Sequence, residues 1–97
     1  MMRDEVICKL RSILSELKQE YQVQALGVFG SVARNEAATG SDIDILVSFT
    51  GKPTYDSYMN LKFYLEDVFQ TKIDLVTEAA LDDRIRSYIE EDLIHVA

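Results

Sequence analysis

The sequence predicts an α/β (α+β) fold in which helices pack on a small mixed β-sheet. Three short apolar segments are typical of strands, segments with helical periodicity separate them, and the connections between them are short. The 97 residues, 47% hydrophobic and 28% charged, are typical of one globular domain, which we expect to span residues 1–97. The sheet is expected to be mixed, because three short strands do not fix their own directions.

The first two elements are expected to be a helix over residues 4–21 and a strand over residues 24–29. The helix is amphipathic, because its apolar side chains recur at steps of three and four: Val6, Leu10, Ile13, Leu14, Leu17 and Tyr21. The strand is short and apolar, and it ends at Gly30 and Ser31. Ser31 is expected to cap a short helix that runs to about Glu36.

The second strand is expected over residues 41–49. A strand has a side-chain period of two, so Asp42 and Asp44 share one face of it. The opposite face carries the apolar side chains Ile43, Ile45, Val47 and Phe49.

The remaining sequence predicts a helix, a strand and a last helix. Thr54 is expected to cap a helix through about Phe69, and residues 72–76 to form the third strand. Thr77 is expected to open the last helix, whose buried side would carry Leu81, Ile85, Tyr88 and Ile89. Residues 93–96 form either the end of that helix or a short edge strand.

The charge and composition exclude several classes of partner. Seventeen acidic and ten basic residues give a formal net charge of −7, whereas a broad nucleic-acid or anionic-membrane surface needs clustered Lys and Arg. No segment approaches the roughly 20 apolar residues of a membrane span. Cys8 is the single cysteine, so no intrachain disulfide forms. We therefore expect a cytoplasmic protein without a membrane or an extended nucleic-acid partner.

Gly30 and Ser31 are the first candidate for chemistry, because they lie between a buried strand and a helix. Glycine lets the backbone approach a ligand closely, and the free N–H groups of a helix start attract anions. An ordinary turn would also explain this pair.

Asp42 and Asp44 are a stronger candidate, because two carboxylates emerge together from an otherwise apolar strand. They repel each other, and partial burial adds to the cost. A Mg²⁺ ion offsets that cost, since it accepts two carboxylates together with substrate phosphate oxygens. The alternative is a solvated strand end at which Asp44 faces water.

Asp74 is a third carboxylate, placed between Ile73 and Leu75 in the third strand. If the second and third strands are neighbours, Asp74 completes a cluster with Asp42 and Asp44. Two metal ions on such a cluster would hold the attacking and leaving oxygens of a phosphoryl displacement. Taken alone, Asp74 is an ordinary exposed strand residue.

These features combine into one pattern, Gly-Ser-x10-Asp-x-Asp, in which Val32 to Ser41 are the ten intervening residues. With Asp74 one strand later, the sequence from Gly30 to Val47 resembles the minimal nucleotidyltransferase (MNT) family of the DNA polymerase β-like nucleotidyltransferase superfamily. The resemblance extends from about residue 17 to residue 96 and implies a polymerase β-like palm.

The resemblance also implies a role for each residue of the pattern. Gly30 and Ser31 would contact the nucleotide phosphates. Asp42 and Asp44 would bind both of two Mg²⁺ ions. Asp74 would bind the catalytic ion and help to activate the acceptor hydroxyl.

Two further positions lie beside the pattern. Arg34 would neutralise phosphate charge, although a surface arginine on a short helix is the alternative reading. Asn35 stands where the family usually has glycine, and asparagine tolerates the left-handed backbone that such a turn needs.

The resemblance implies transfer of AMP from ATP to a hydroxyl, with pyrophosphate as leaving group. MNT proteins are commonly antitoxins that adenylylate a tyrosine of a HEPN-domain ribonuclease toxin, and we expect the same here. The 97 residues contain no separate region to hold an acceptor, which favours a protein partner. One alternative is a binding module that neutralises its partner by steric masking, without catalysis. A third option is a free-standing adenylyltransferase for small molecules, which the short length of the chain disfavours.

Overall fold

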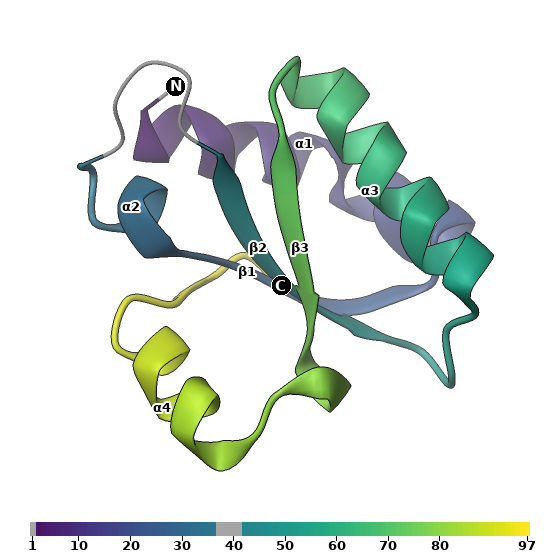
Figure 1. The fold of residues 1–97 in the computed structure, drawn as a ribbon. Coiled ribbons are helices and arrows are strands. Elements are labelled where there is room, and N and C mark those ends of the chain that lie inside the picture. Colours follow the sequence, from purple (N-terminus) through teal and green to yellow (C-terminus); the bar gives the residue numbers. More distant parts are fainter. Residues whose placement is uncertain (1, 37–41) are drawn as a thin grey trace.

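A four-stranded sheet organises the chain in the computed structural model, which describes residues 2–36 and 42–97 (Figure 1). The elements are α1 (Arg3–Glu20), β1 (Val23–Phe29), α2 (Gly30–Ala33), β2 (Ile43–Phe49), α3 (Tyr55–Phe69), β3 (Ile73–Thr77), the 3₁₀ helix η1 (Glu78–Ala80), α4 (Asp83–Glu90) and β4 (Ile94–His95). The expected Ser41 start of the second strand lies outside the described residues.

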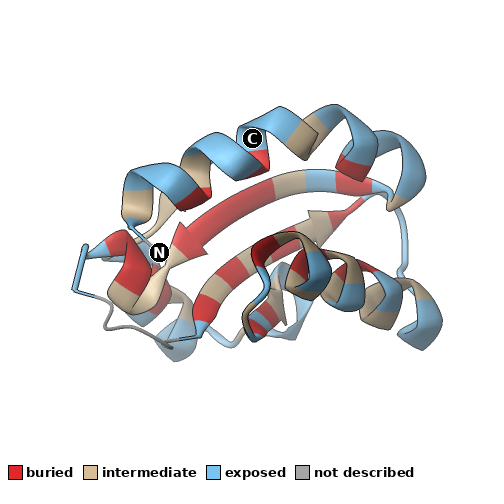
Figure 2. Cartoon of the chain, turned by 90° about the horizontal axis from the view of Figure 1, so that it is seen from above, coloured by how far each residue is buried: buried red, intermediate tan, exposed pale blue. Residues whose placement is uncertain are grey.

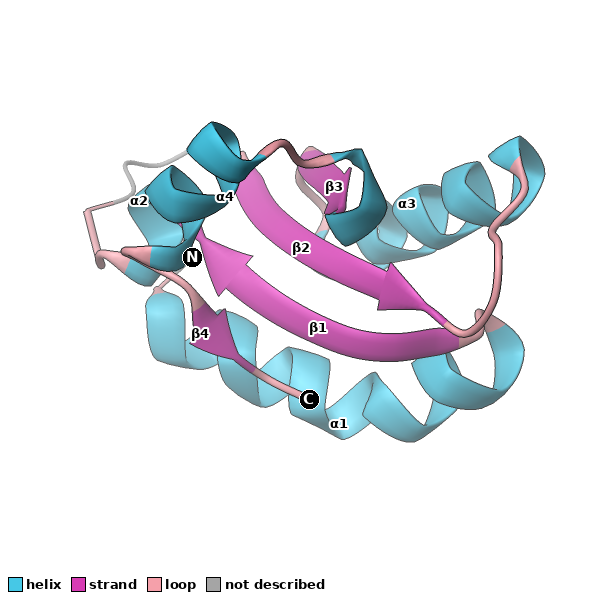
Figure 3. Cartoon of the chain, turned by 90° about the horizontal axis from the view of Figure 1, so that it is seen from below, coloured by secondary structure: helices cyan, strands magenta, loops and turns pink. Residues whose placement is uncertain are grey.

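The sheet is mixed, as predicted. Its strand order is β3-β2-β1-β4, in which β1 runs antiparallel to both β2 and β4, while β2 and β3 are parallel. Figure 3 shows β1 and β2 side by side with the short β4 next to β1. The C-terminal residues therefore form a short edge strand, which was one of the two expected outcomes.

The hydrophobic core lies between one face of the sheet and helices α1 and α3. All four apolar side chains predicted for one face of β2 are buried, which confirms the period-two assignment. The helices contribute Val6, Leu10, Leu17, Leu61, Leu65 and Phe69 to the same cluster. Figure 2 shows these buried positions on the facing sides of strands and helices. The side chains of β2 that alternate with the buried ones, Asp44 among them, therefore lie on the other face, next to α4.

The prediction for the last helix was wrong in its start and in its buried side. The strand continues through Thr77, η1 follows, and α4 begins only at Asp83, because the Asp82 side chain accepts a hydrogen bond from the Ile85 N–H at 2.9 Å. Ile85 and Tyr88 are 47% and 70% exposed. The physical reason is that α4 lies over the sheet with one side only, and Ile89 alone is buried there.

The short helix α2 also differs from the prediction. It begins at Gly30 rather than after a Ser31 cap, and its N-cap position, Phe29, makes no side-chain capping hydrogen bond. It ends at Ala33 instead of near Glu36, because Asn35 adopts a left-handed backbone with φ of 60°. Asn35 thus takes the conformation that a glycine would take at this position.

The predicted cap of α3 is confirmed. The Thr54 hydroxyl oxygen accepts a hydrogen bond from the Ser57 N–H at 3.0 Å, and the Ser57 side chain accepts one from the Thr54 N–H at 2.8 Å. Within the described residues, no helix has the length and apolar character to cross a membrane.

Candidate functional site

The register of the sheet brings three of the predicted site residues, Gly30, Asp44 and Asp74, into one row. Phe29, the residue before Gly30, is paired with Asp44 across β1 and β2, and Asp44 is paired with Asp74 across β2 and β3. The sequence alone did not show whether the second and third strands are neighbours. In the structure they form a parallel pair, in which Asp44 and Asp74 are adjacent. Gly30, Asp44 and Asp74 therefore lie together at one end of the sheet, although 44 positions separate the first from the last in the sequence.

Gly30 is required at its position for two independent reasons. Its φ is +74°, a left-handed conformation that side chains with a Cβ rarely adopt. A Cβ added there would also lie 2.1 Å from Oδ2 of Asp44. The turn after β1 therefore packs directly on the carboxylate of β2, so the expected phosphate-binding turn and the expected metal ligand form one structural unit.

The carboxyl group of Asp44 is the most strongly perturbed acid of the site. Burial is the main reason that its pKa rises from 3.8 to about 6. The negative charge of Asp74, a hydrogen bond with Asp74 and the charge of Asp42 raise the pKa further, while the positive charge of Arg34 lowers it. The three predicted aspartates are thus close enough to interact electrically, and the ionised form of Asp44 lacks a sufficient counter-charge.

This donor set fits a hard divalent cation. Carboxylate oxygens are the donors that Mg²⁺ prefers, and Mg²⁺ is commonly held by one or two carboxylates together with phosphate oxygens and water. In residues 2–36 and 42–97, no three His, Cys, Asp or Glu side chains already surround a common point. Asp44 and Asp74 form the close pair, whereas Asp42 is exposed just before β2. The protein thus provides a carboxylate pair whose repulsion a cation would relieve.

Arg34 lies in the same region, but its guanidinium is already engaged. It donates one hydrogen bond to Asp92 at 2.6 Å and one to Glu36 at 3.0 Å. These hydrogen bonds, led by the one to Glu36, raise the pKa of Arg34. Arg34 is therefore an exposed residue that ties α2 to the segment after α4, as well as a source of positive charge near Asp44.

Ser31 is half-buried in the first turn of α2. Its carbonyl oxygen accepts a hydrogen bond from the Glu36 N–H at 2.9 Å. This hydrogen bond spans α2 and closes the turn that follows it. Contact of Ser31 with phosphate stays a prediction.

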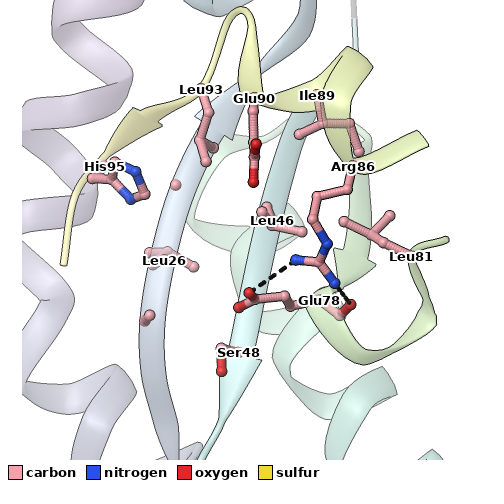
Figure 4. Close-up of a pocket in the computed structure, with 12 residues that line it drawn as sticks. Leu26, Leu46, Ser48, Glu78, Leu81, Arg86, Ile89, Glu90, Leu93 and His95 are labelled. Carbon is pink, nitrogen blue, oxygen red and sulfur yellow. Dashed lines mark hydrogen bonds and ion pairs between the residues drawn. The ribbon is translucent and has the colours of Figure 1, made fainter. Parts of the chain in front are cut away.

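The structure contains a cavity that the sequence patterns did not predict. It has a volume of about 310 Å³ and lies between the face of β1 and β2 that carries Asp44 and the segment from η1 to β4 (Figure 4). Its floor includes Gly27 and Leu46, and its wall includes Ile89 and Glu90. Strand periodicity does predict that Leu46 shares a face with Asp44, but the position of the C-terminal helix above that face has no local signal.

A second feature that the sequence did not predict is the cover of the edge strand β3 by side chains of α3. The Glu66 carboxylate accepts a hydrogen bond from the Ile73 N–H at 3.2 Å, and the Tyr58 hydroxyl donates one to the Leu75 carbonyl. Both backbone groups belong to an edge strand, and covering them reduces the tendency of that edge to pair with another chain. Asp74 stays exposed on this strand.

Comparison with known proteins gives a consistent result over nearly the whole chain. The model of the nucleotidyltransferase domain family matches residues 7–96. A protein of Methanocaldococcus jannaschii assigned to the protein adenylyltransferases is 42% identical over 97 residues, which cover 95% of this chain and 99% of that relative. The protein adenylyltransferase MntA of Thermococcus cleftensis is 33% identical over 93 residues, with 96% and 94% covered.

Solved structures agree on the fold. A structure assigned as a minimal nucleotidyltransferase superposes with a TM-score of 0.81 at 32% identity, over 97% of this chain and 95% of the other. A chain from a toxin–antitoxin complex with AMP-PNP gives a TM-score of 0.75 at 18% identity, over 90% and 72%. A chain from the complex of a tri-AMPylated Shewanella oneidensis HEPN toxin with its MNT antitoxin gives 0.69 at 16% identity, over 94% and 71%. At such low sequence identity, the last two comparisons establish similarity of the fold alone.

Proposed function

Because this chain belongs to the nucleotidyltransferase domain family, we propose that it is a Mg²⁺-dependent protein adenylyltransferase. It transfers AMP from ATP to a hydroxyl group, a tyrosine of a partner HEPN ribonuclease toxin, and so acts as the antitoxin in the cytoplasm. The observation that carries this proposal is the row of Gly30, Asp44 and Asp74 at one end of the sheet.

The proposed step is one displacement at phosphorus. The acceptor oxygen attacks the α-phosphorus of ATP, and the bond from that phosphorus to the oxygen bridging to the β-phosphate breaks. Pyrophosphate leaves with the bonding electrons, and the proton of the acceptor hydroxyl passes to Asp74. Exposure of the Asp74 side chain supports this role, because an acceptor on a large partner can reach an exposed carboxylate.

Gly30 and Ser31 are proposed to hold the phosphates beside Asp44, with Arg34 adding positive charge at that end. Asp42, Asp44 and Asp74 are proposed to hold two Mg²⁺ ions. Bound there, Mg²⁺ would stabilise the negative charge that develops on the phosphoryl oxygens and lower the pKa of the attacking hydroxyl. The raised pKa of Asp44 supports this assignment, since a nearby divalent cation would favour its ionised form.

Two lines of support favour a protein acceptor. The relatives include a protein adenylyltransferase named MntA at 33% identity, and the fold recurs in complexes of MNT antitoxins with HEPN toxins. The net charge of −7 also suits a partner with a basic surface.

The direct test is incubation of the chain with Mg²⁺, α-labelled ATP and the HEPN protein of its own genome. We expect label on the HEPN protein, and loss of at least 100-fold in rate when Asp42→Ala is combined with Asp44→Ala, because the charge-stabilising carboxylates are removed. A control that combines Asp4→Ala with Asp67→Ala removes two exposed acids elsewhere and should keep wild-type rates. Absence of label transfer, or transfer undiminished in the Asp42 and Asp44 variant, would refute the proposal.

Steric masking is tested with the same variants in cells. If neutralisation requires AMP transfer, the Asp42→Ala, Asp44→Ala variant should bind the toxin and yet fail to protect the cells. Full protection by that variant would show that binding alone neutralises the toxin.

A further inference from the structure

Two large apolar side chains of α3 point away from the core. Tyr55 is 76% exposed and Phe63 is 57% exposed. Met59, which is half-buried, lies four positions from each of them, so the three side chains follow one another along one face of the helix. We call Tyr55, Met59 and Phe63 the α3 stripe. Exposed aromatic and methionine side chains that gather in this way are typical of protein–protein contacts.

The α3 stripe leads into a groove between the start of α3 and the end of β3, two elements that lie side by side in Figure 1. The groove is open to solvent, has a volume of about 470 Å³ and includes Tyr55, Pro53 and Ala80 in its lining. The Tyr58 hydroxyl donates a hydrogen bond to the Leu75 carbonyl, which holds the Tyr58 ring in place as part of that lining. The groove is therefore a preformed depression that continues the α3 stripe.

The groove also reaches the face of β3 that carries Asp74. Val76 lines the groove and follows Asp74 by two positions, so the two side chains emerge about 7 Å apart on the same face of the strand. The pKa of Tyr58 agrees with this placement, because burial raises it most and the negative charge of Asp74 raises it further. A protein that binds in the groove therefore lies beside the carboxylate to which the acceptor proton is proposed to pass.

The charge of this surface distinguishes between two possible occupants. Asp56, next to Tyr55, is an exposed acid, and the whole chain carries a net charge of −7. Two copies of the chain that met through α3 would therefore bring like charges together, which opposes their association. A different protein, with an apolar patch flanked by Lys and Arg, would match both the α3 stripe and the acidic charge around it.

We propose that the α3 stripe and the adjoining groove form the surface on which the protein acceptor docks. The partner places apolar side chains against the stripe and in the groove, and basic side chains opposite Asp56. This inference rests on the proposed function, because it names where the acceptor of that reaction binds. It gives the outer face of α3 a role in holding the partner while the carboxylates carry out the transfer.

The test measures binding of the HEPN protein of the same genome to the purified chain by calorimetry. Tyr55→Ala combined with Phe63→Ala removes the two exposed rings and should raise the Kd for the HEPN protein about tenfold or more, because aromatic anchors carry much of the binding energy of an interface. Both side chains face solvent, so the variant should fold and should bind Mg²⁺-ATP as wild type does.

The matched control changes the two exposed apolar side chains of α4. Ile85 and Tyr88 are 47% and 70% exposed, so Ile85→Ala combined with Tyr88→Ala removes a comparable apolar surface elsewhere on the protein. This control should bind the HEPN protein with wild-type affinity. Loss of affinity in the control, with none in the α3 variant, would place the partner on α4 and overturn the proposal.

A second pair of variants tests the groove itself. Ala80 lines the groove, and Ala80→Arg adds both bulk and a positive charge where a basic partner should bind, so the Kd should again rise about tenfold or more. Ala79→Arg makes the same change at the neighbouring exposed residue, outside the lining, and should bind as wild type. Equal Kd values for these two variants would overturn the groove assignment, even if the double variant of the stripe fails to fold.

Self-association is the alternative occupant, and light scattering over a range of concentrations detects it. Unchanged HEPN affinity in the folded Tyr55→Ala, Phe63→Ala variant overturns the docking proposal. If the wild-type chain also dimerises and that variant does not, the α3 stripe binds a second copy instead.

The docking proposal and the transfer proposal fail in different ways. If the HEPN protein binds through these residues but receives no AMP, the docking surface stands and the transfer proposal falls. If AMP is transferred and all four variants bind the HEPN protein as wild type does, the transfer proposal stands and the docking surface falls.

Discussion

At the scale of single residues, the contact of Asp44 with Gly30 and Asp74 carries both a cost and a proposed function. The folded-state pKa of Asp44 is about 6, above its ordinary value of 3.8, so the folded protein binds this proton more tightly than the unfolded chain. The electrostatic cost is therefore fully present above pH 6. It declines as the pH falls from 6 and is gone below 3.8.

Asp44→Asn should consequently stabilise the fold at pH 7 by about 1 kcal/mol, after allowance for partial solvent screening, while abolishing AMP transfer. The gain should shrink as the pH is lowered from 6 to 4. Urea unfolding at several pH values measures this effect. A variant less stable than wild type at pH 7, or a gain independent of pH, would contradict this account of Asp44.

Gly30→Ala should destabilise the protein by on the order of 1–3 kcal/mol, because alanine would be strained at φ of +74° and would collide with Asp44. Gly51→Ala is the matched control, since Gly51 has φ of +78° and open space around the added Cβ. Thermal unfolding of the two variants separates backbone strain from the collision. Equal losses would show that the contact with Asp44 has no energetic effect.

At the scale of elements, the ion pair of Arg34 with Asp92 ties α2 to the segment after α4, across 58 positions in the sequence. Arg34→Asp should lower the free energy of unfolding by about 0.5–1 kcal/mol and raise the KM for ATP. Combining it with Asp92→Arg should restore stability and leave KM high, because the acid at position 34 repels phosphate. If KM recovers together with stability, Arg34 acts only by tying the two elements together.

The elements differ in how far the sequence determines them. The period of two in residues 43–49 predicts which face of β2 is buried, because Ile43, Ile45, Val47 and Phe49 alternate with Asp44, Leu46 and Ser48. The start of α4 was not predictable in the same way, because Thr77 and Asp82 are both good caps. The choice between them depends on the extension of β3 to Thr77 along β2, which is a tertiary contact.

At the scale of the whole molecule, the candidate site depends on pairings that local sequence does not encode. Strand periodicity predicted Asp42 and Asp44 on one face of a strand, but β2 begins only at Ile43. The approach of Asp74 to Asp44 required the parallel pairing of β2 with β3. The cavity between α4 and strands β1 and β2 likewise required α4 to fold back over the sheet. Short spacings in the sequence thus singled out the candidate residues, whereas the way they come together, and the cavity beside them, arise from contacts between distant segments.

We propose that the chain transfers AMP to its partner through Asp42 and Asp44. Intact-mass spectrometry of the HEPN protein, purified after co-expression with this chain, measures that transfer. We expect its mass to increase by one or more AMP units with the wild-type chain, and to stay unmodified with the Asp42→Ala, Asp44→Ala variant. An unmodified partner with the wild-type chain, or the same increase with the variant, would contradict the claim.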